Sequence, residues 1–199
     1  MGRFLVALLI NALVLAYPAY LGYKYRLSPA IHDITTDPID PPRFDALARL
    51  RTSDGANTAV YAGLYSAEQQ RLAYPDIETV QLDVPVQRAY EATLALVTRR
   101  KWRIVDARPP QPPRREGHIE AVARTPVMGF REDVAIRVLA DGTGARIDIR
   151  SSSRYFESDL GSNAARIAKL IEDLNNVADD NVAPVKKAPT GAQAKGAKK

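Results

Sequence analysis

The order of hydrophobic patterns along the chain predicts an α+β domain, a two-layer fold with a mostly antiparallel five-stranded sheet covered by two helices. Residues 77–84 alternate apolar and polar side chains as a half-buried strand does, and residues 86–101 repeat apolar side chains at helical spacing. Four further strand-like segments follow without a helix between them, and a second helical pattern closes the series. Consecutive strands favour antiparallel pairing, and helices confined to the ends of the series favour one covered face.

The N-terminal segment predicts one transmembrane helix before this domain. Residues 4–22 carry no charge, and at about 1.5 Å per residue they span roughly 28 Å, close to the hydrocarbon core of a bilayer. Four tyrosines gather at the far end of the segment, as in an interfacial aromatic belt: Tyr17, Tyr20, Tyr23 and Tyr25. The alternative is a cleaved signal peptide, but a small-x-small cleavage site is missing where it should be. We therefore expect an uncleaved anchor over residues 1–23.

The charges that flank the apolar run do not by themselves predict the orientation of this anchor. Arg3 and the α-amine precede the apolar run, and Lys24 and Arg26 follow it, so the positive-inside count is nearly tied. A very short tail before the apolar run is typical of a signal anchor, which translocates the C-terminal body. We expect a single-pass protein of the inner membrane with a periplasmic domain, and the cytoplasmic orientation stays open as the alternative.

Residues 24–42 read as an extended acidic and proline-rich tether, because the prolines in the run Asp37–Pro42 disfavour helix. A short helix is expected over residues 43–51, where Phe44, Leu47 and Leu50 share one face. Residues 52–75 are weakly patterned and carry no prediction.

The domain proper is expected over residues 43–178. Pro85 suits the first turn of the helix 86–101, and Arg99 and Arg100 suit the negative end of its dipole. The further strands are predicted at residues 102–107, 118–124, 130–139 and 145–153, and the hairpin signal Asp141–Gly144 joins the last two. The second helix is predicted at residues 162–177. Residues 179–199 form a Lys-rich tail that we expect to be disordered, because it has few apolar side chains.

Charge and composition exclude several classes of function. The formal net charge of +5 divides into +3 for residues 1–30, −3 for 31–70, zero for 71–181 and +5 for 182–199. The body is near neutral, which argues against nucleic-acid binding by a globally basic fold. The absence of cysteine excludes disulfides and thiol catalysis, and two histidines argue against a His-rich metal centre. We expect no metal and no cofactor.

The densest group of polar residues lies between the last strand and the last helix. Guanidinium groups, hydroxyls and a helix N-terminus together can hold an anion. The structural alternative is that Asp159, Ser162 or Asn163 caps the helix and that Asp159 accepts hydrogen bonds from Arg154 or Arg166. The candidate ligand-binding residues are Arg137, Arg150, Ser151, Ser153, Arg154, Asp159, Asn163 and Arg166.

A second polar group is expected on one face of the sheet, where strand alternation places Glu120, Arg124, Arg137, Asp148 and Arg150. Cross-strand ion pairs explain these charges, and a cleft lined by arginines is the sharper alternative. Glu132 and Asp133 are adjacent carboxylates, but no nucleophile or partner histidine is recognisable, so we assign no catalytic residue.

Several sequence blocks resemble those of a known family. They comprise His32–Asp37, Pro41–Pro42 with Phe44, Glu120–Ala121 with Thr125, Phe130–Arg137 with Asp133 and Val134, Asp148–Arg154, and Asp159–Ile167. Together they resemble the domain of unknown function 1499 family over about residues 30–177. The chain departs from the pattern at Arg131–Asp133 and at Tyr155–Glu157. The resemblance implies a domain attached to a bacterial membrane or exported, with related plant proteins associated with plastids. It carries over no activity, cofactor or catalytic residue.

These observations lead to one principal interpretation and two alternatives. We expect a non-enzymatic, membrane-anchored envelope protein that binds a protein or an anionic, lipid-like ligand, and no nucleic acid. The first alternative is a hydrolase or transferase that acts on an anionic envelope substrate through Asp133 and the arginines. The second is a structural spacer. The oligomeric state is not predicted.

Overall fold

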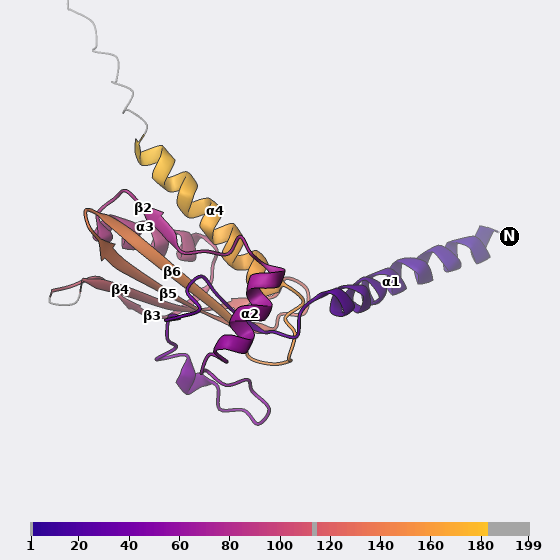
Figure 1. Cartoon of the computed structure of the whole chain (residues 1–199). Coiled ribbons are helices and arrows are strands. Elements are labelled where there is room, and N and C mark those ends of the chain that lie inside the picture. Colours follow the sequence, from indigo (N-terminus) through magenta and orange to yellow (C-terminus); the bar gives the residue numbers. More distant parts are fainter. Residues whose placement is uncertain (1, 113–114, 183–199) are drawn as a thin grey trace, which may run out of the picture.

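The computed structural model describes residues 2–112 and 115–182. A helix α1 precedes a domain whose two main helices lie along one side of a sheet (Figure 1). The elements in chain order are α1 (Gly2–Leu27), β1 (Asp33–Thr35), a 3₁₀ turn (Ala48–Leu50), α2 (Leu64–Ala73), β2 (Val80–Leu82), α3 (Val86–Arg99), β3 (Arg103–Arg108), β4 (Glu116–Arg124), β5 (Arg131–Asp141), β6 (Gly144–Ser153) and α4 (Ser162–Val182). The Lys-rich tail was expected from residue 179, but residues 179–182 continue helix α4, and the rest of the expected tail, from residue 183 onward, lies outside the described residues.

The sheet is antiparallel throughout and confirms the predicted α+β class. Its order is β1-β6-β5-β4-β3, and β2 also pairs with β6. The β5–β6 hairpin aligns Ile136 with Ile149 and turns at Asp141–Gly144, where Gly142 has a φ of +57°. The sheet has six strands rather than the expected five. The additional strand is β1, which lies within the segment predicted as a tether and pairs with residues 150–152 of β6.

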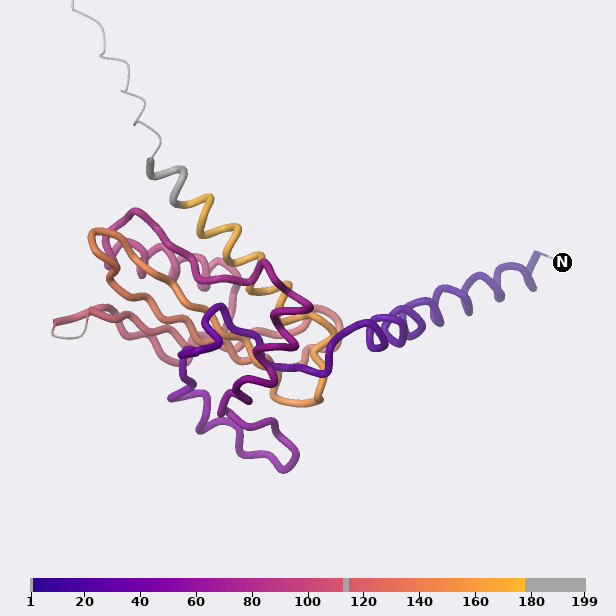
Figure 2. Tube along the Cα trace, viewed as in Figure 1, coloured from indigo at the N-terminus to yellow at the C-terminus, as the bar shows by residue number. Residues whose placement is uncertain are grey.

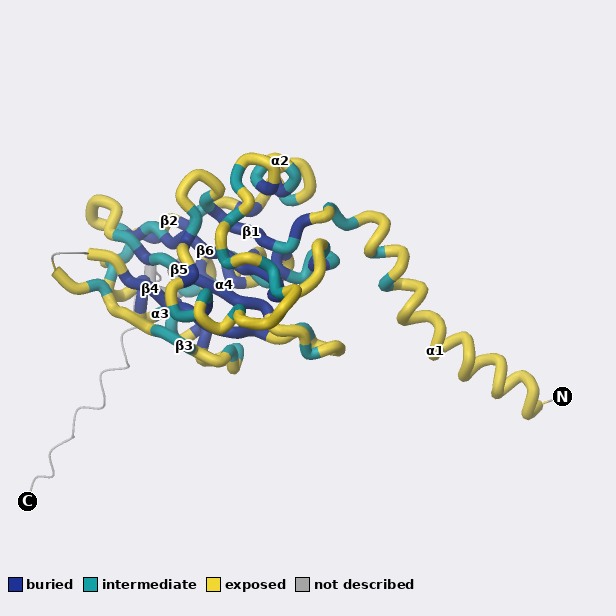
Figure 3. The backbone as a smooth tube through the Cα atoms, turned by 90° about the horizontal axis from the view of Figure 1, so that it is seen from below, coloured by how far each residue is buried: buried dark blue, intermediate teal, exposed yellow. Residues whose placement is uncertain are grey.

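The helix layer covers one face of the sheet and forms the main core. Alternate residues of β4, β5 and β6 point into this layer, and their neighbours point to the opposite face. The fully buried members include Val97 of α3 together with Ile167, Leu170 and Leu174 of α4. Figure 3 shows this interior as buried and α1 as almost wholly exposed.

An irregular segment, residues 36–61, covers part of the opposite face, and we call it the cover segment. Phe44 and Leu47 pack there against Val122 and Ala135 in a small second core. The helix expected over 43–51 is reduced to the 3₁₀ turn, because the backbone N–H groups of residues 45–47 donate to the Glu120 carboxylate of β4.

Helix α2 follows the cover segment and has a polar buried face. Its buried residues are Ser66 and Gln70. The Gln70 amide accepts from the backbone N–H of Thr35 at 3.0 Å and donates to the Thr35 carbonyl at 2.6 Å, so it continues the hydrogen bonding of β1. A helix that buries polar side chains lacks the apolar stripe by which a helix is predicted from sequence, which is why residues 64–73 carried no prediction.

Helix α1 has the length and composition of a membrane-spanning helix. Its most apolar window has a mean hydropathy of 2.1, and none of its residues is buried in the protein. A signal sequence near the N-terminus has the same properties. The helix leaves the domain at the end where β4 and β6 finish (Figure 2).

Candidate functional site

Between the sheet and the cover segment, a layer of charged side chains surrounds the small second core. Its buried members come from alternate positions of β1, β4, β5 and β6, which strand geometry points toward one face. They are Asp33, Glu120, Asp133, Asp148, Arg150 and Arg154. We call this the ionic layer.

Arg150 joins three parts of the chain within the ionic layer. Its guanidinium donates to both Asp33 oxygens at 2.9 and 2.6 Å, so it ties β6 to β1. It also donates to the carbonyls of Pro42 and Ala59, and lies 4.4 Å from the centre of the Phe44 ring. The backbone carbonyls of an irregular segment need such partners because they have no strand or helix neighbours.

Asp133 is clamped by two arginines. Arg154 donates to both carboxylate oxygens at 2.8–3.1 Å, and Arg51 donates to Oδ2 at 2.9 Å. The Asp133 side chain is 0% exposed, and Arg51 and Arg154 are 2% and 5% exposed. A carboxylate that is closed off in this way does not reach a substrate.

Arg137 lies at the outer edge of the same layer. It donates to Asp148 at 2.9 Å and to the carboxylate of Asp40 at 2.7 Å, and contacts Asp37 at 3.3 Å. Its hydrogen bonds to Asp148 and Asp40 outweigh the effect of burial and raise the pKa of Arg137.

The remaining candidate residues lie on the helix face, where β5 and β6 meet the start of α4. Ser151 donates to Asn163 at 2.7 Å, and Asn163 donates to Ser153 at 2.9 Å. Arg166 contacts Ser151 and forms an ion pair with Glu132. The eight candidate residues therefore do not surround one space: Arg137, Arg150 and Arg154 are separated by the sheet from the group around Asn163.

Asp159 caps helix α4. Its two carboxylate oxygens accept from the backbone N–H groups of Gly161 and Asn163, each at 2.8 Å. Burial raises the pKa of Asp159, against the opposing effect of these two N–H groups. Neither Arg154 nor Arg166 pairs with Asp159, because Arg154 binds Asp133 and Arg166 binds Glu132.

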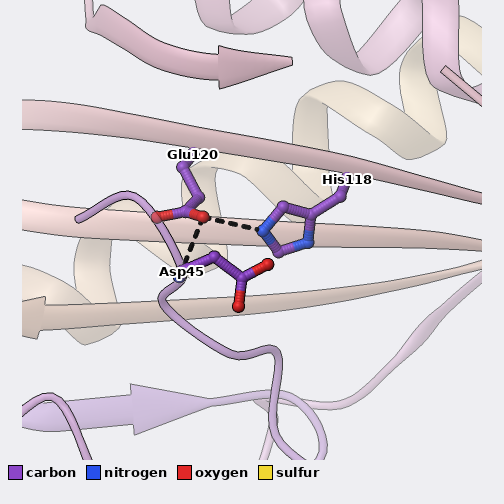
Figure 4. A group of neighbouring side chains, drawn as sticks. All are labelled: Asp45, His118 and Glu120. Carbon is purple, nitrogen blue, oxygen red and sulfur yellow. Dashed lines mark hydrogen bonds and ion pairs between the residues drawn. The ribbon is translucent and has the colours of Figure 1, made fainter. Parts of the chain in front are cut away.

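A polar cleft of about 640 Å³ opens at the end of the ionic layer where β4 begins. His118 lies in its wall and Glu120 lies buried behind it (Figure 4). The His118 Nε2 is 3.1 Å from Glu120 Oε1. Burial alone would raise the pKa of Glu120, but hydrogen bonds from His118 and from the N–H groups of residues 45–47 lower it to about 2.

Asp45, His118 and Glu120 bring three ligand-type atoms within 4.8 Å of one another. They do not fit a metal ion well. Glu120 Oε1 already accepts from His118 and from the N–H groups of residues 45 and 46, and the Asp45 carboxylate pairs with Arg108 at 2.6 Å. From the sequence, His118 counted only as one of the two histidines of the chain. The signal that identifies the pair is its i, i+2 spacing, which places both side chains on one face of a strand.

The cleft is ringed by charges of both signs. Its basic members are Arg43, Arg108 and Arg137, and its acidic members are Asp40, Asp45 and Glu116. Arg43 is exposed and forms no ion pair with any described residue. Of the candidate residues from the sequence, Arg137 alone lines this cleft.

Comparisons with known proteins identify the family. No curated protein matches the chain in sequence. The crystal structure of Ara h 8.0201 is a structural match with a TM-score of 0.30 and 11% identity, covering 52% of this chain and 96% of that one. The family described as "Protein of unknown function (DUF1499)" matches residues 33–174, which run from β1 into α4. The match confirms the resemblance found in the sequence: the chain belongs to the DUF1499 family.

Proposed function

We propose that this protein is a membrane-anchored binding module that takes a small anionic ligand in the polar cleft. The observation that carries the proposal is the ring of Arg43, Arg108 and Arg137 around the cleft, with His118 in its wall. Arginines bind carboxylate and phosphate groups through two parallel hydrogen bonds, which gives both affinity and orientation.

Asp40, one of the acidic residues of the cleft, can make way for such a ligand. Asp40 is 67% exposed at its side chain and belongs to the cover segment, so a ligand oxyanion can take its place on Arg137. Arg43 has its donors free of other described side chains. Glu120 does not line the cleft, and its carboxylate accepts hydrogen bonds from three backbone N–H groups and contacts His118 instead of facing the ligand space.

The lining favours binding over nucleophilic catalysis. No serine, threonine or lysine lies among the described lining residues, and Asp133 is closed off within the ionic layer. A second candidate function is a hydrolase in which His118, oriented by Glu120, activates water, or a transferase in which it activates the hydroxyl of an acceptor. The His118–Glu120 hydrogen bond is the observation that favours it.

We further propose that α1 remains attached as a single-pass anchor in the inner membrane, with the domain in the periplasm. The uncharged run, the tyrosines at its end and the missing cleavage site support this placement. Protease treatment of spheroplasts is expected to degrade the domain. A domain protected from external protease would refute the periplasmic orientation.

The binding proposal is tested by titration of the full chain in mild detergent with inorganic phosphate and with citrate. A charge-assisted hydrogen bond contributes about 1.5–3 kcal/mol, so Arg43→Gln is expected to weaken binding by roughly tenfold or more. Arg103→Gln is the matched control, because Arg103 is also exposed, lies on β3 and does not line the cleft. Absence of saturable binding, or equal affinity of the two variants, would refute the proposal and favour a spacer.

A second variant distinguishes the catalytic alternative from the binding module. His118→Gln preserves a hydrogen-bond donor toward Glu120 but removes the basic nitrogen. Loss of turnover of phosphate or carboxylate esters, with phosphate binding retained, would favour the hydrolase over the binding module.

A further inference from the structure

Two loops at the α1 end of the domain expose large apolar side chains together. The β4–β5 loop carries Val127, Met128 and Phe130, and the β6–α4 loop carries Tyr155 and Phe156. Val127, Met128 and Phe156 are 67%, 58% and 61% exposed. Figures 1 and 2 show both loops beside the point where α1 leaves the domain. We call these five residues the apolar tip.

The two loops are held in place rather than left loose. The Phe130 and Phe156 rings meet edge to face with centroids 5.2 Å apart. Thr125 bonds Phe130 through both its backbone and its hydroxyl, at 2.9–3.0 Å, which closes the first loop.

Phe156 adopts a backbone conformation that a bulky residue rarely takes, with a φ of +71°. Asn57 of the cover segment donates to its carbonyl at 2.9 Å and so holds it there. Strain of this kind persists where the surrounding structure imposes it and is frequent at functional positions. Here it keeps an aromatic side chain exposed.

The apolar tip lies beside the aromatic end of α1, and the two line one hollow. A hollow of about 470 Å³ separates them, lined on one side by Tyr17, Tyr20 and Leu21 of α1 and on the other by the tip. If α1 spans a bilayer, its tyrosines lie at the interface between lipid tails and headgroups. The tip then lies at the interface as well.

The charges around the tip suit a membrane surface. Lys24, Arg26, Arg124 and Arg131 lie on α1 or at the loop ends. Of the acidic residues nearby, Glu132 and Asp159 are buried and Glu157 is exposed, so the accessible charge around the tip is mainly basic. Basic residues at this depth are attracted to anionic headgroups.

We propose that the apolar tip inserts into the headgroup and upper acyl region of the same bilayer that α1 crosses, and that lipid fills the hollow between them. The domain is thereby fixed against the membrane at two points. Its ionic layer runs away from the bilayer, and the polar cleft at the far end of β4 faces water. This inference rests on the uncleaved anchor proposed above, and not on the ligand of the cleft.

The absence of cysteine from the chain makes a direct test simple. Single cysteines at Met128 and Phe156 are labelled with an environment-sensitive fluorophore in the full chain, which is reconstituted into vesicles of phosphatidylcholine and phosphatidylglycerol. Ile39→Cys is the apolar control, since Ile39 is 95% exposed on the cover segment, and Thr143→Cys lies at the opposite turn of the β5–β6 hairpin. Nitroxide-bearing lipids report contact with the bilayer.

Labels at Met128 and Phe156 are expected to emit at shorter wavelength and to be quenched severalfold more strongly than the two controls. With the label at Val127→Cys, the pair Met128→Ser and Phe156→Asn is expected to reduce quenching, since asparagine tolerates the left-handed backbone at residue 156. Equal quenching at all positions, in a chain whose intact mass shows that α1 is retained, would overturn the inference. Tip labels shielded from water but not quenched by lipid would show that α1 or a second copy of this chain covers the tip, and would also overturn it.

Discussion

Replacing Asp133 by asparagine is the sharpest test of whether the ionic layer supports the fold. The substitution leaves Arg51 and Arg154 buried without a counterion and turns an amide N–H₂ group toward one of them. Breaking a buried ion pair by removing one partner costs about 3–5 kcal/mol. A domain of this size loses about 2–4 °C in Tm per kcal/mol, so Tm is expected to fall by roughly 6–20 °C.

The measurement is thermal and urea unfolding in mild detergent, followed by fluorescence of Trp102, the single tryptophan. Glu68→Gln is the control, because the Glu68–Arg71 pair is exposed and is expected to contribute little. If Asp133→Asn were as stable as this control but lost phosphate binding, the view of Asp133 as a structural residue would be wrong.

A triple variant distinguishes the effect of an unpaired buried charge from the effect of altered packing. Replacing Asp133 by leucine together with Arg51→Met and Arg154→Met removes all three charges, and such replacements are often neutral or stabilising. We expect it to recover part of the lost stability. The recovery is partial because Arg51 also donates to the carbonyls of Asn57, Thr58 and Ser152.

Three further predictions concern individual contacts. The pKa of Glu120 is lowered from 4.5 to about 2, so the ionised carboxylate contributes about 3 kcal/mol to the free energy of unfolding above pH 4.5, and this contribution is lost as the pH falls toward 2. The unfolding midpoint of Glu120→Gln should therefore depend less on pH in that range than the midpoint of the wild type. Equal pH dependence of the two proteins would contradict the assignment. Gly117→Ala places a Cβ 2.5 Å from Tyr90 Cδ2, so the free energy of unfolding measured in urea should fall by about 1–3 kcal/mol. A variant as stable as the wild type would mean that Tyr90 and α3 can move aside. Asp159→Ala removes the cap of α4 and should cost about 0.5–2 kcal/mol, whereas Asp159→Asn should retain part of it; equal losses would argue against capping.

The elements predicted best are those whose pattern is local and apolar. Strands β4, β5 and β6 and helices α3 and α4 all lie where the alternation or helical spacing placed them, within about two residues at their starts. Each of these elements buries one face in the main core, so the spacing of apolar residues within the segment is enough to predict which side chains are buried. The hairpin turn at Gly142 was found for the same reason.

The elements that were missed depend on contacts between distant parts of the chain. Strand β1 exists because Asp33–Thr35 pair with residues 150–152, and the 3₁₀ turn exists because Glu120 binds N–H groups 73 to 75 residues earlier in the chain. Helix α2 buries Gln70, whose partner is the backbone of Thr35. No local pattern contains these pairings.

The candidate site shows the same division. The sequence singled out eight polar residues as one candidate group, but their arrangement depends on the sheet, because strand alternation sends neighbours such as Arg150 and Ser151 to opposite faces. The sequence by itself determined the apolar helix, the family and the core of the α+β fold, all of which depend on the order of residue types. Only the tertiary structure decided that Arg150 binds Asp33, 117 residues away, and that His118 lines a cleft with the buried Glu120 behind it, because buried charges are paired by the folding of distant segments onto one another.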